Sequence, residues 1–517
     1  MIKKLFSFHI SLFLLLLLAA FLRLYHIRDY LTFLGDEGRD VLIAYNILHG
    51  HLTLLGPTAS VGGFFLGPIY YYFIAPFLWL FQYDPVGPAV MVALFGVATV
   101  WLVYFVGERF FNKTTGFIAA TLYTISPLVI AYARSSWNPN LMPFFTLLLL
   151  FVAYKAVKKD SWRLFACVGI LYGIVMQLHY IEVFIGVVIA VYIFIAFSYQ
   201  KKHILQGIVF TVKNYVVFLI GFLIGWSPFL AFEARHGFPN TRSILQFVFM
   251  SKEAGAGAGF SLNFLDVFYR LFGRLVLNIP SPDLYKTITP TLAIWMVAVW
   301  VVGIVATGNL LFLLWKHRNS SDKFLQYSLL VLWLFFGVIL FGFYRKAIYD
   351  YYLEFIFPLP FFLVGEVGSF LLRKNLVVKG IATVLLLVLV AINLTGVPFR
   401  YPANKQLQQT EIIAQNVLQM THSQPYNFAL ITGGNSDYAY RYFLTIWGHP
   451  PVTIENPSVD PQRKTVTKQL IVVCESVPCG PLGYSLWEIA GFGRADIAEK
   501  KHVVVVDIYR LVHYQGK

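Results

Sequence analysis

Long apolar runs separated by short polar connections fill about the first 400 residues of the 517-residue chain. A helix of about 20 apolar residues is long enough to cross about 30 Å of hydrocarbon. The runs do not alternate apolar and polar residues, which excludes a transmembrane β-barrel. The pattern therefore predicts an all-α polytopic membrane protein with eleven spans, near residues 6–24, 88–107, 116–133, 140–154, 164–180, 182–198, 214–232, 291–315, 324–343, 352–372 and 378–397.

The first run also has features of a signal peptide, because Lys3 and Lys4 precede its apolar core. No small-x-small cleavage site follows Ala20, and the sequence continues with large apolar residues. We therefore expect an uncleaved first span, with a signal peptide as the alternative.

The connection between the first two spans, residues 25–87, is too long to be a simple linker. From Val41, apolar residues recur at helical spacing, which predicts an amphipathic helix over residues 36–49. Residues 64–81 are apolar and aromatic, but their two prolines interrupt the hydrogen bonding that a lipid-exposed crossing requires. We therefore expect two interfacial helices here; a kinked twelfth span over 64–81 is the alternative.

The composition changes after residue 397, which predicts a transmembrane domain over 1–397 and a small α/β domain over 398–517. Residues 406–420 are expected to form a helix. Short strands are expected at 428–432, 470–474 and 503–509. The polar loop 433–437 is typical of a turn and also of a phosphate cradle, so both interpretations stay open.

Charge is scarce, because 58% of the residues are hydrophobic and 13% are charged. The net charge of +15 does not indicate nucleic acid here, since Lys and Arg gather in alternate connections such as those with Lys158 and Lys201. This asymmetry predicts a cytoplasmic N-terminus. With eleven spans, the connection 233–290 and the C-terminal domain would then face the outside.

Three cysteines are too few for a disulfide scaffold or a four-cysteine zinc site. Cys167 lies within a predicted span and is expected to be an apolar filler. Cys474 and Cys479 lie together in the outer domain, where an oxidising compartment favours a disulfide between them.

No Walker loop, dinucleotide fingerprint, zinc-protease motif or nucleophile elbow occurs in the chain. The most informative segment is Gly35-Asp36-Glu37-Gly38-Arg39-Asp40, directly after the first span. One interpretation makes Asp36 the N-cap of the following helix, with Glu37 and Asp40 complementing the helix dipole. The other makes these carboxylates a catalytic site.

The order of the motifs resembles the GT-C membrane glycosyltransferases, and within them glycosyltransferase family 39, the relatives of protein mannosyltransferases and aminoarabinose transferases. The resemblance covers about residues 1–400 and depends on the order of weak motifs. Besides the acidic segment they are Gly67-Pro68-Ile69-Tyr70-Tyr71-Tyr72, Ser126-Pro127-Leu128, Tyr132-Ala133-Arg134, Gln177-Leu178-His179-Tyr180, Pro228-Phe229 and Glu233-Ala234-Arg235-His236-Gly237-Phe238.

This resemblance implies transfer of a sugar from a polyprenyl-phosphate carrier to an acceptor hydroxyl on the outer face, usually with inversion. An acceptor hydroxyl needs a base, and Asp36 is the candidate, with Glu37 as a supporting acid. The leaving lipid phosphate needs fixed cations, for which the candidates are Arg235, His236, Arg345, Lys346 and His179. Interfacial anchoring explains the first four equally well, and His179 can also be a core histidine.

The acceptor side departs from many family members, which have a second acidic residue after the third span. Here that loop has Asn138 and Asn140, which can bind a sugar or an acceptor but cannot act as bases. Tyr349 can stack on a sugar or anchor the interface. No metal and no cofactor are expected. The expected partners are the lipid-linked donor, membrane lipids and an acceptor that is a protein, lipid or glycan.

Two other classes of function fit the same membrane architecture. A lipid-linked oligosaccharide transporter would use a similar aromatic cavity without a base, and a membrane scaffold would use the outer domain to bind partners. The sequence does not identify the sugar or the acceptor.

Overall fold

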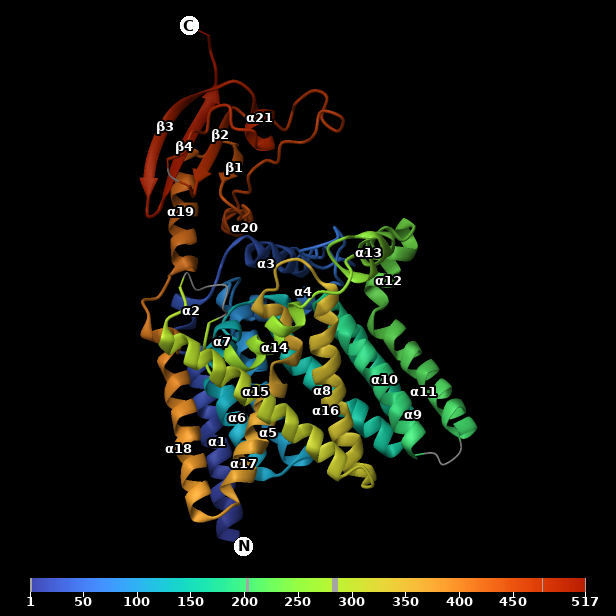
Figure 1. Ribbon diagram of the computed structural model, residues 1–517. Helices are drawn as coiled ribbons and strands as arrows, with labels where there is room; N and C mark the ends of the chain where they lie inside the picture. Colours follow the sequence, from blue (N-terminus) through green and yellow to red (C-terminus); the bar gives the residue numbers. More distant parts are fainter. Residues whose placement is uncertain (1, 201–203, 281–286, 477, 517) are drawn as a thin grey trace. The chain divides into compact units, whose positions relative to one another are not determined.

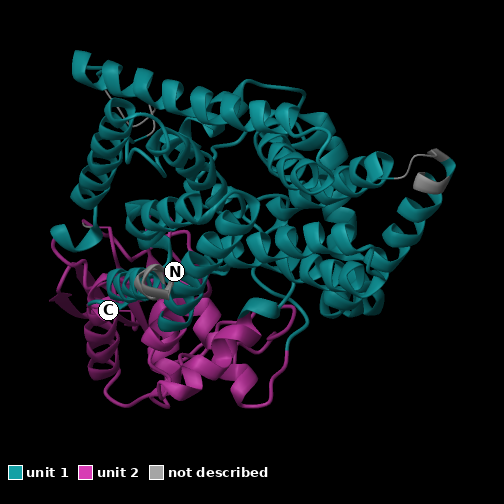
Figure 2. Ribbon diagram, turned by 90° about the horizontal axis from the view of Figure 1, so that it is seen from below, with its two compact units in different colours: residues 1–25, 53–70, 90–401 teal, residues 26–52, 71–89, 402–517 magenta. Residues whose placement is uncertain are grey.

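The computed structural model describes residues 2–200, 204–280, 287–476 and 478–516. Lys201, used above for the orientation, lies outside this range. The chain divides into two compact units, and each is discontinuous in sequence (Figure 2). Unit 1 comprises residues 1–25, 53–70 and 90–401, and unit 2 comprises residues 26–52, 71–89 and 402–517.

Unit 1 is a helical bundle (Figure 1). Its helices are α1 (Ile2–Leu24), α5 (Val86–Phe110), α6 (Lys113–Ile125), α7 (Pro127–Tyr132), α8 (Met142–Lys159), α9 (Trp162–Leu178), α10 (Val183–Gln200), α11 (Ile204–Gly225), α12 (Ser227–His236), α13 (Pro239–Met250), α14 (Asn263–Gly273), α15 (Pro290–Lys316), α16 (Ser321–Ile339), α17 (Pro358–Leu372) and α18 (Leu376–Thr395). Short 3₁₀ turns η1 (Asn138–Leu141), η2 (Tyr180–Glu182) and η6 (Asp350–Ile356) connect some of them.

Every predicted span coincides with one or more of these helices, and the fold class is confirmed. Within the described residues, seven helices are long and apolar enough to cross a membrane, or eight if the bent pair η6 and α17 is one span. The apolar parts of α1 and α9 are shorter, so the number of eleven crossings stays a prediction. Three spans predicted as single helices are broken, at Pro127, Pro228 and Pro358, because each proline lies in the first turn of a new helix.

The aromatic segment 64–81 contains α4 (Ile69–Leu80), a helix of 12 residues with Pro76 inside it. At about 1.5 Å per residue such a helix is much shorter than the hydrocarbon core. Its length therefore favours the interfacial placement over a twelfth span.

The connection 233–290 contains helices that the pattern analysis did not identify, α13 and α14 among them. Arg270 of α14 and Arg274, the residue that caps the end of α14, bind one carboxylate at the start of η6. Arg270 lies 3.2 Å from Asp350, and Arg274 lies 2.8 Å from the same side chain. Arg270 also pairs with Asp266 at 2.7 Å. These ion pairs fasten η6 to α14.

Unit 2 joins parts of the predicted first outer connection to the C-terminal residues (Figure 2). Besides most of α4, its elements are α2 (Ile27–Tyr30), α3 (Gly35–Leu48), α19 (Gln406–Met420), β1 (Asn427–Ile431), α20 (Tyr438–Ile446), β2 (Gln469–Cys474), α21 (Trp487–Phe492), β3 (Ala495–Val503) and β4 (Val506–His513). The strand order is β1-β2-β4-β3, and only β1 and β2 are parallel.

The predicted helices at 36–49 and 406–420 and the first two strands are confirmed within a residue or two. The third predicted strand, 503–509, is wrong in its bounds, because a turn after Val503 separates β3 from β4. Strand β3 was missed since its sequence is mostly polar and its side chains are largely exposed. Lysines on an exposed edge strand oppose pairing with other chains.

Helix α3 packs closely on α20 within unit 2. A Cβ atom on Gly38 would lie 2.3 Å from the backbone nitrogen of Ala439, and one on Gly35 would lie 2.0 Å from Ser436 Oγ. The two glycines of the acidic segment therefore permit a backbone approach that any larger residue would prevent.

Further polar contacts join the early and late segments of unit 2. Arg28 of α2 pairs with Asp84, and its other amino group lies 2.8 Å from Glu411 of α19. Phe33 N–H donates to Gln406 at 3.2 Å. These contacts make residues 26–52 part of the same folded body as the sheet.

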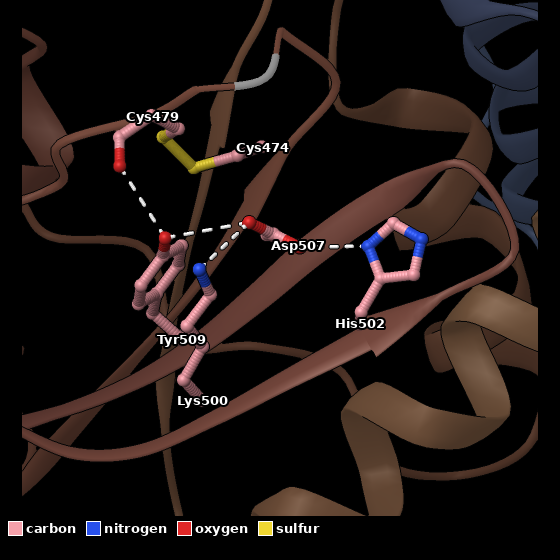
Figure 3. Close-up of a disulfide and its surroundings, with 6 residues drawn as sticks. All are labelled: Cys474, Cys479, Lys500, His502, Asp507 and Tyr509. Atoms are coloured by element: carbon pink, nitrogen blue, oxygen red, sulfur yellow. Dashed lines mark hydrogen bonds and ion pairs between the residues drawn. A yellow bond between two sulfur atoms is a disulfide. The ribbon is translucent and has the colours of Figure 1, made fainter.

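The predicted disulfide between Cys474 and Cys479 is present at the end of β2 (Figure 3). Tyr509 of β4 donates to the carbonyl of Cys479 at 3.3 Å. Asp507 accepts from His502 at 2.8 Å and pairs with Lys500 at 3.0 Å. The disulfide and the hydrogen bond from Tyr509 thus connect Cys479 to strands β2 and β4.

Candidate functional site

The first turn of α3 carries the candidate carboxylates. The helix begins at Gly35 with Leu34 as its N-cap, so the interpretation of Asp36 as N-cap is wrong. Glu37 contributes to the cap instead, because its Oε2 accepts the Leu34 N–H at 3.0 Å. The Asp36 side chain therefore takes no part in the N-terminal cap of α3.

Arg39 links Asp36 to Asp40. Its Nη1 donates to Asp36 Oδ1 at 2.8 Å, while Nη2 and Nε donate to Asp40 Oδ1 at 2.7 and 3.0 Å. Asp40 is fully buried, whereas the side chain of Asp36 is 54% exposed. The buried Asp40 thus fixes the position of Arg39, which in turn binds the exposed Asp36, and the Asp36 carboxylate stays accessible to a substrate.

Burial changes the ionisation of the other two carboxyl groups. It raises the pKa of Glu37 to about 7, against hydrogen bonds from the backbone of Leu34 and of Glu37 itself. Burial also raises the pKa of Asp40 to about 7, and the Arg39 guanidinium opposes this rise only in part. This turn therefore takes up protons at a higher pH than ordinary carboxylates do.

The raised pKa of Glu37 predicts a stability that falls as the pH rises. Between about pH 4.5 and 7 the folded state keeps a proton that the unfolded state releases, so the free energy of unfolding decreases across this window. One pKa unit corresponds to about 1.4 kcal/mol, so the decrease due to Glu37 is on the order of 3 kcal/mol.

Glu37→Gln keeps the acceptor for Leu34 but cannot titrate. Thermal unfolding of both proteins in detergent, measured from pH 4.5 to 8, should show a weaker pH dependence in the variant. Identical pH slopes would contradict an elevated pKa at Glu37.

A second group of candidates lies in unit 1, where η1, η2 and η6 contribute an aromatic cluster. Ring centroids are 4.4 Å apart for Trp137 and Tyr351, 4.5 Å for His179 and Tyr180, and 5.3 Å for His179 and Tyr352. We define the aromatic cluster as Trp137, His179, Tyr180, Tyr344, Tyr349, Tyr351 and Tyr352. It brings His179 and Tyr349, two of the predicted site residues, into one neighbourhood.

Three predicted residues make hydrogen bonds within this part of the fold. His179 is buried, and its Nδ1 accepts the Ile181 N–H at 3.3 Å. Asn138 donates to the carbonyl of Leu178 at 2.5 Å. Asn140 donates to the carbonyls of Tyr132 and Ser135 at 2.7 and 2.8 Å. Their polar groups thus shape the loops around the aromatic cluster.

Apart from the buried His179, the candidate cations of unit 1 are exposed: Arg235, His236, Arg345 and Lys346. Lys346 pairs with Glu253 at 2.8 Å, and the Arg345 N–H donates to the Glu253 carbonyl at 2.8 Å. Among the described residues, no carboxylate pairs with the Arg345 guanidinium. His236 bonds only the Phe232 carbonyl in the preceding turn, at 2.9 Å.

Arg235 and His236 lie in the last turn of α12. Glu233 in the same turn accepts from Asn240 at 2.8 Å and from the Thr241 N–H at 2.7 Å. Asn240 in turn accepts the Phe65 N–H at 2.9 Å. These hydrogen bonds connect the end of α12, which carries Arg235 and His236, to the segment that precedes α4. Among the described residues, no hydrogen bond or ion pair joins these two side chains to Arg345.

Sequence reasoning missed two groups of interacting side chains. In unit 1 they are Asp350 and its two arginines. In unit 2 they are Asn435, which accepts the Gly35 N–H, and Glu475, which binds Asn435. The spacing of Arg270 and Arg274 on one helix face was the only available signal. In the described part of the chain, no group of three or more His, Cys, Asp or Glu side chains has the arrangement of a metal site.

Comparisons with known proteins agree with the architecture. The family model for dolichyl-phosphate-mannose-protein mannosyltransferase matches residues 66–230. No curated protein matches the chain.

Two solved structures have a similar fold. ArnT from Cupriavidus metallidurans bound to undecaprenyl phosphate is 12% identical, with a TM-score of 0.58 and coverage of 98% of both chains. The oligosaccharyltransferase AglB from Archaeoglobus fulgidus, in complex with an inhibitory peptide and a dolichol-phosphate, is 13% identical with a TM-score of 0.51. That match covers 91% of this chain and 69% of AglB. The family model thus supports the resemblance to glycosyltransferase family 39 over residues 66–230, and this multi-pass membrane protein has a fold similar to that of the GT-C membrane glycosyltransferases.

Proposed function

We propose that this protein transfers a sugar from a polyprenyl-phosphate carrier to an acceptor hydroxyl on the outer face of the membrane, with inversion at the anomeric carbon. The observation that carries the proposal is the exposed Asp36 carboxylate, which Arg39 holds on the first turn of α3 in a chain with the GT-C fold.

In the proposed reaction Asp36 acts as the general base. The acceptor hydroxyl gives its proton to Asp36 while its oxygen attacks the anomeric carbon. The bond between that carbon and the phosphate oxygen breaks, and the polyprenyl phosphate leaves with the electron pair. Arg39 keeps one oxygen of Asp36 occupied, which leaves the other for the proton.

The donor phosphate is proposed to bind the exposed cations of unit 1. Arg345 is the first candidate, because it has no carboxylate partner among the described residues. Lys346, Arg235 and His236 are secondary candidates. A polyprenyl phosphate as the donor class is supported by the undecaprenyl phosphate in the ArnT structure and the dolichol-phosphate in the AglB structure.

The acceptor or sugar is proposed to contact Tyr349, whose side chain is exposed and stacks on Tyr351 at 5.7 Å. An exposed ring offers an apolar face to a sugar. We assign Asn138, Asn140 and His179 to shaping this region, because their polar groups bond the backbone of the surrounding loops.

Purified protein with labelled polyprenyl-phosphate sugars tests the proposal against the two alternatives. A glycosyltransferase releases free polyprenyl phosphate in the presence of cell-envelope acceptors. A transporter would move the intact labelled lipid between the leaflets of proteoliposomes without releasing it, and a scaffold would do neither.

The orientation gives a separate expectation, since the proposed chemistry takes place outside the cytoplasm. Cysteines introduced at Ser458 and Lys158, with Cys167 replaced by Ser and the disulfide left intact, should differ in intact cells. An impermeant maleimide should label position 458 and should reach position 158 only after the membrane is opened. The reverse pattern would place the acidic turn of α3 on the cytoplasmic side.

A further inference from the structure

The first turn of α3 obtains its N-terminal hydrogen bond from the C-terminal part of the chain. Asn435 Oδ1 accepts the Gly35 N–H at 2.8 Å and also the Ser436 N–H at 2.9 Å. The side chain of an N-cap Ser, Thr, Asp or Asn normally accepts the N–H of the second or third helical residue, whereas Asn435 accepts the N–H of the first. Leu34 occupies the N-cap position here and has no such group.

Asn435 is itself held by Glu475. Its Nδ2 donates to the two carboxylate oxygens of Glu475 at 3.0 and 3.3 Å. Glu475 also accepts from Thr432 at 2.7 Å and from Tyr440 at 2.9 Å. The amide group of Asn435 therefore has one orientation, with its oxygen toward α3.

The carboxyl ends of the two parallel strands supply this network. Thr432 follows β1, and Glu475 follows β2 directly after Cys474. The disulfide closes the short segment that begins with Glu475. The sheet thus presents a fixed acceptor to the helix that carries Asp36.

We propose that Asn435, oriented by Glu475, is a positioning residue for Asp36. By capping α3 at Gly35 it fixes the first helical turn, and so the direction of the Asp36 carboxylate toward the acceptor hydroxyl. This inference rests on the proposed function of Asp36 as the base. It assigns to the C-terminal domain a part in catalysis without contact with substrate.

The expected result of Asn435→Ala is a kcat lower by about 10–100-fold with an unchanged KM for the lipid donor, since misplacement of a reacting group by about 1 Å has effects of this size. Asn456→Ala is the matched control, because Asn456 lies in the same domain and its side chain accepts hydrogen bonds from Ser458, two residues further along the chain. The control should retain the wild-type kcat. Hydrogen exchange of the Gly35 amide should accelerate in Asn435→Ala alone.

A reciprocal exchange of donor and acceptor gives a sharper test. Asn435→Asp keeps the acceptor for Gly35 but places a carboxylate against Glu475, so kcat should fall. Adding Glu475→Gln supplies an amide donor to the new aspartate, so the double variant should recover most of the kcat. A stability defect alone would lower the yield of active protein without this rescue.

The outcomes separate the positioning role from the base. An inactive Asp36→Asn with a fully active Asn435→Ala would overturn the positioning role and leave the base in place. An active Asp36→Asn would overturn the base. If Asn435→Ala cannot be isolated, the comparison of Asn435→Asp with the double variant decides, and equal activity of the two would overturn the proposal.

Discussion

Asp36→Asn is expected to lower turnover by about 10²–10⁴-fold while the protein still folds and binds the lipid donor, which is the usual contribution of general-base catalysis. The substitution keeps an oxygen that can accept from Arg39, so the hydrogen bond at 2.8 Å is retained. It removes only the capacity to take a proton from the acceptor. Release of polyprenyl phosphate, together with donor binding measured separately, gives the result.

The controls use the other carboxylates of unit 2. Glu37→Gln should have a milder effect on turnover, because Glu37 bonds Leu34 and is buried away from a substrate. Asp496→Asn, on the exposed strand β3, should leave turnover unchanged. If Asp36→Asn behaves like Asp496→Asn, Asp36 is only an ion-pair partner of Arg39 and another group is the base.

Asp350→Ala is expected to lower the free energy of unfolding by about 3 kcal/mol, the lower end of the cost of removing one partner from a buried ion pair. Asp350 is largely buried, and its carboxylate serves both Arg270 and Arg274. In the variant the largely buried guanidinium of Arg274 would lose its ion pair with the Asp350 carboxylate. It should also loosen η6 and weaken donor binding, because Tyr351 and Tyr352 of the aromatic cluster follow Asp350 directly.

Asp266→Asn is the matched comparison for Asp350. Its carboxylate lies 2.7 Å from Arg270 and is more exposed than that of Asp350, so a cost below about 1 kcal/mol is expected. A double variant with Arg274→Ala and Asp350→Ala should cost less than the sum of the single changes. Additive costs measured by chemical denaturation in detergent would show that the two side chains are not coupled.

The long apolar helices of unit 1, and helices α3 and α19 of unit 2, were predictable from the sequence because their hydrogen bonds are local. In a membrane every backbone group must be satisfied within its own helix, so an apolar run of sufficient length determines the element. The amphipathic helix α3 followed from periodicity around Val41 in the same way. Breaks at Pro127 and Pro228 were less visible, since apolar residues continue on both sides.

The organisation of the candidate site was not predictable, because its partners are distant in sequence. Asp36 was a natural choice of N-cap by residue type, yet Glu37 and Asn435 share that role. The sequence indicated no role for Gly35 and Gly38, and only the packing on α20 explains them. Periodicity carries no information about such contacts.

The cap at Gly35 also has a consequence for the biogenesis of the protein. Gly35 and Asn435 are 400 residues apart, so at about 5–20 residues per second the ribosome needs roughly 20–80 s to add the partner. Throughout this interval the acidic turn lacks the contact that orders it. If Asn435 positions Asp36 as proposed, the acidic turn reaches its full activity only after β1, β2 and the residues that follow them have been made and have folded.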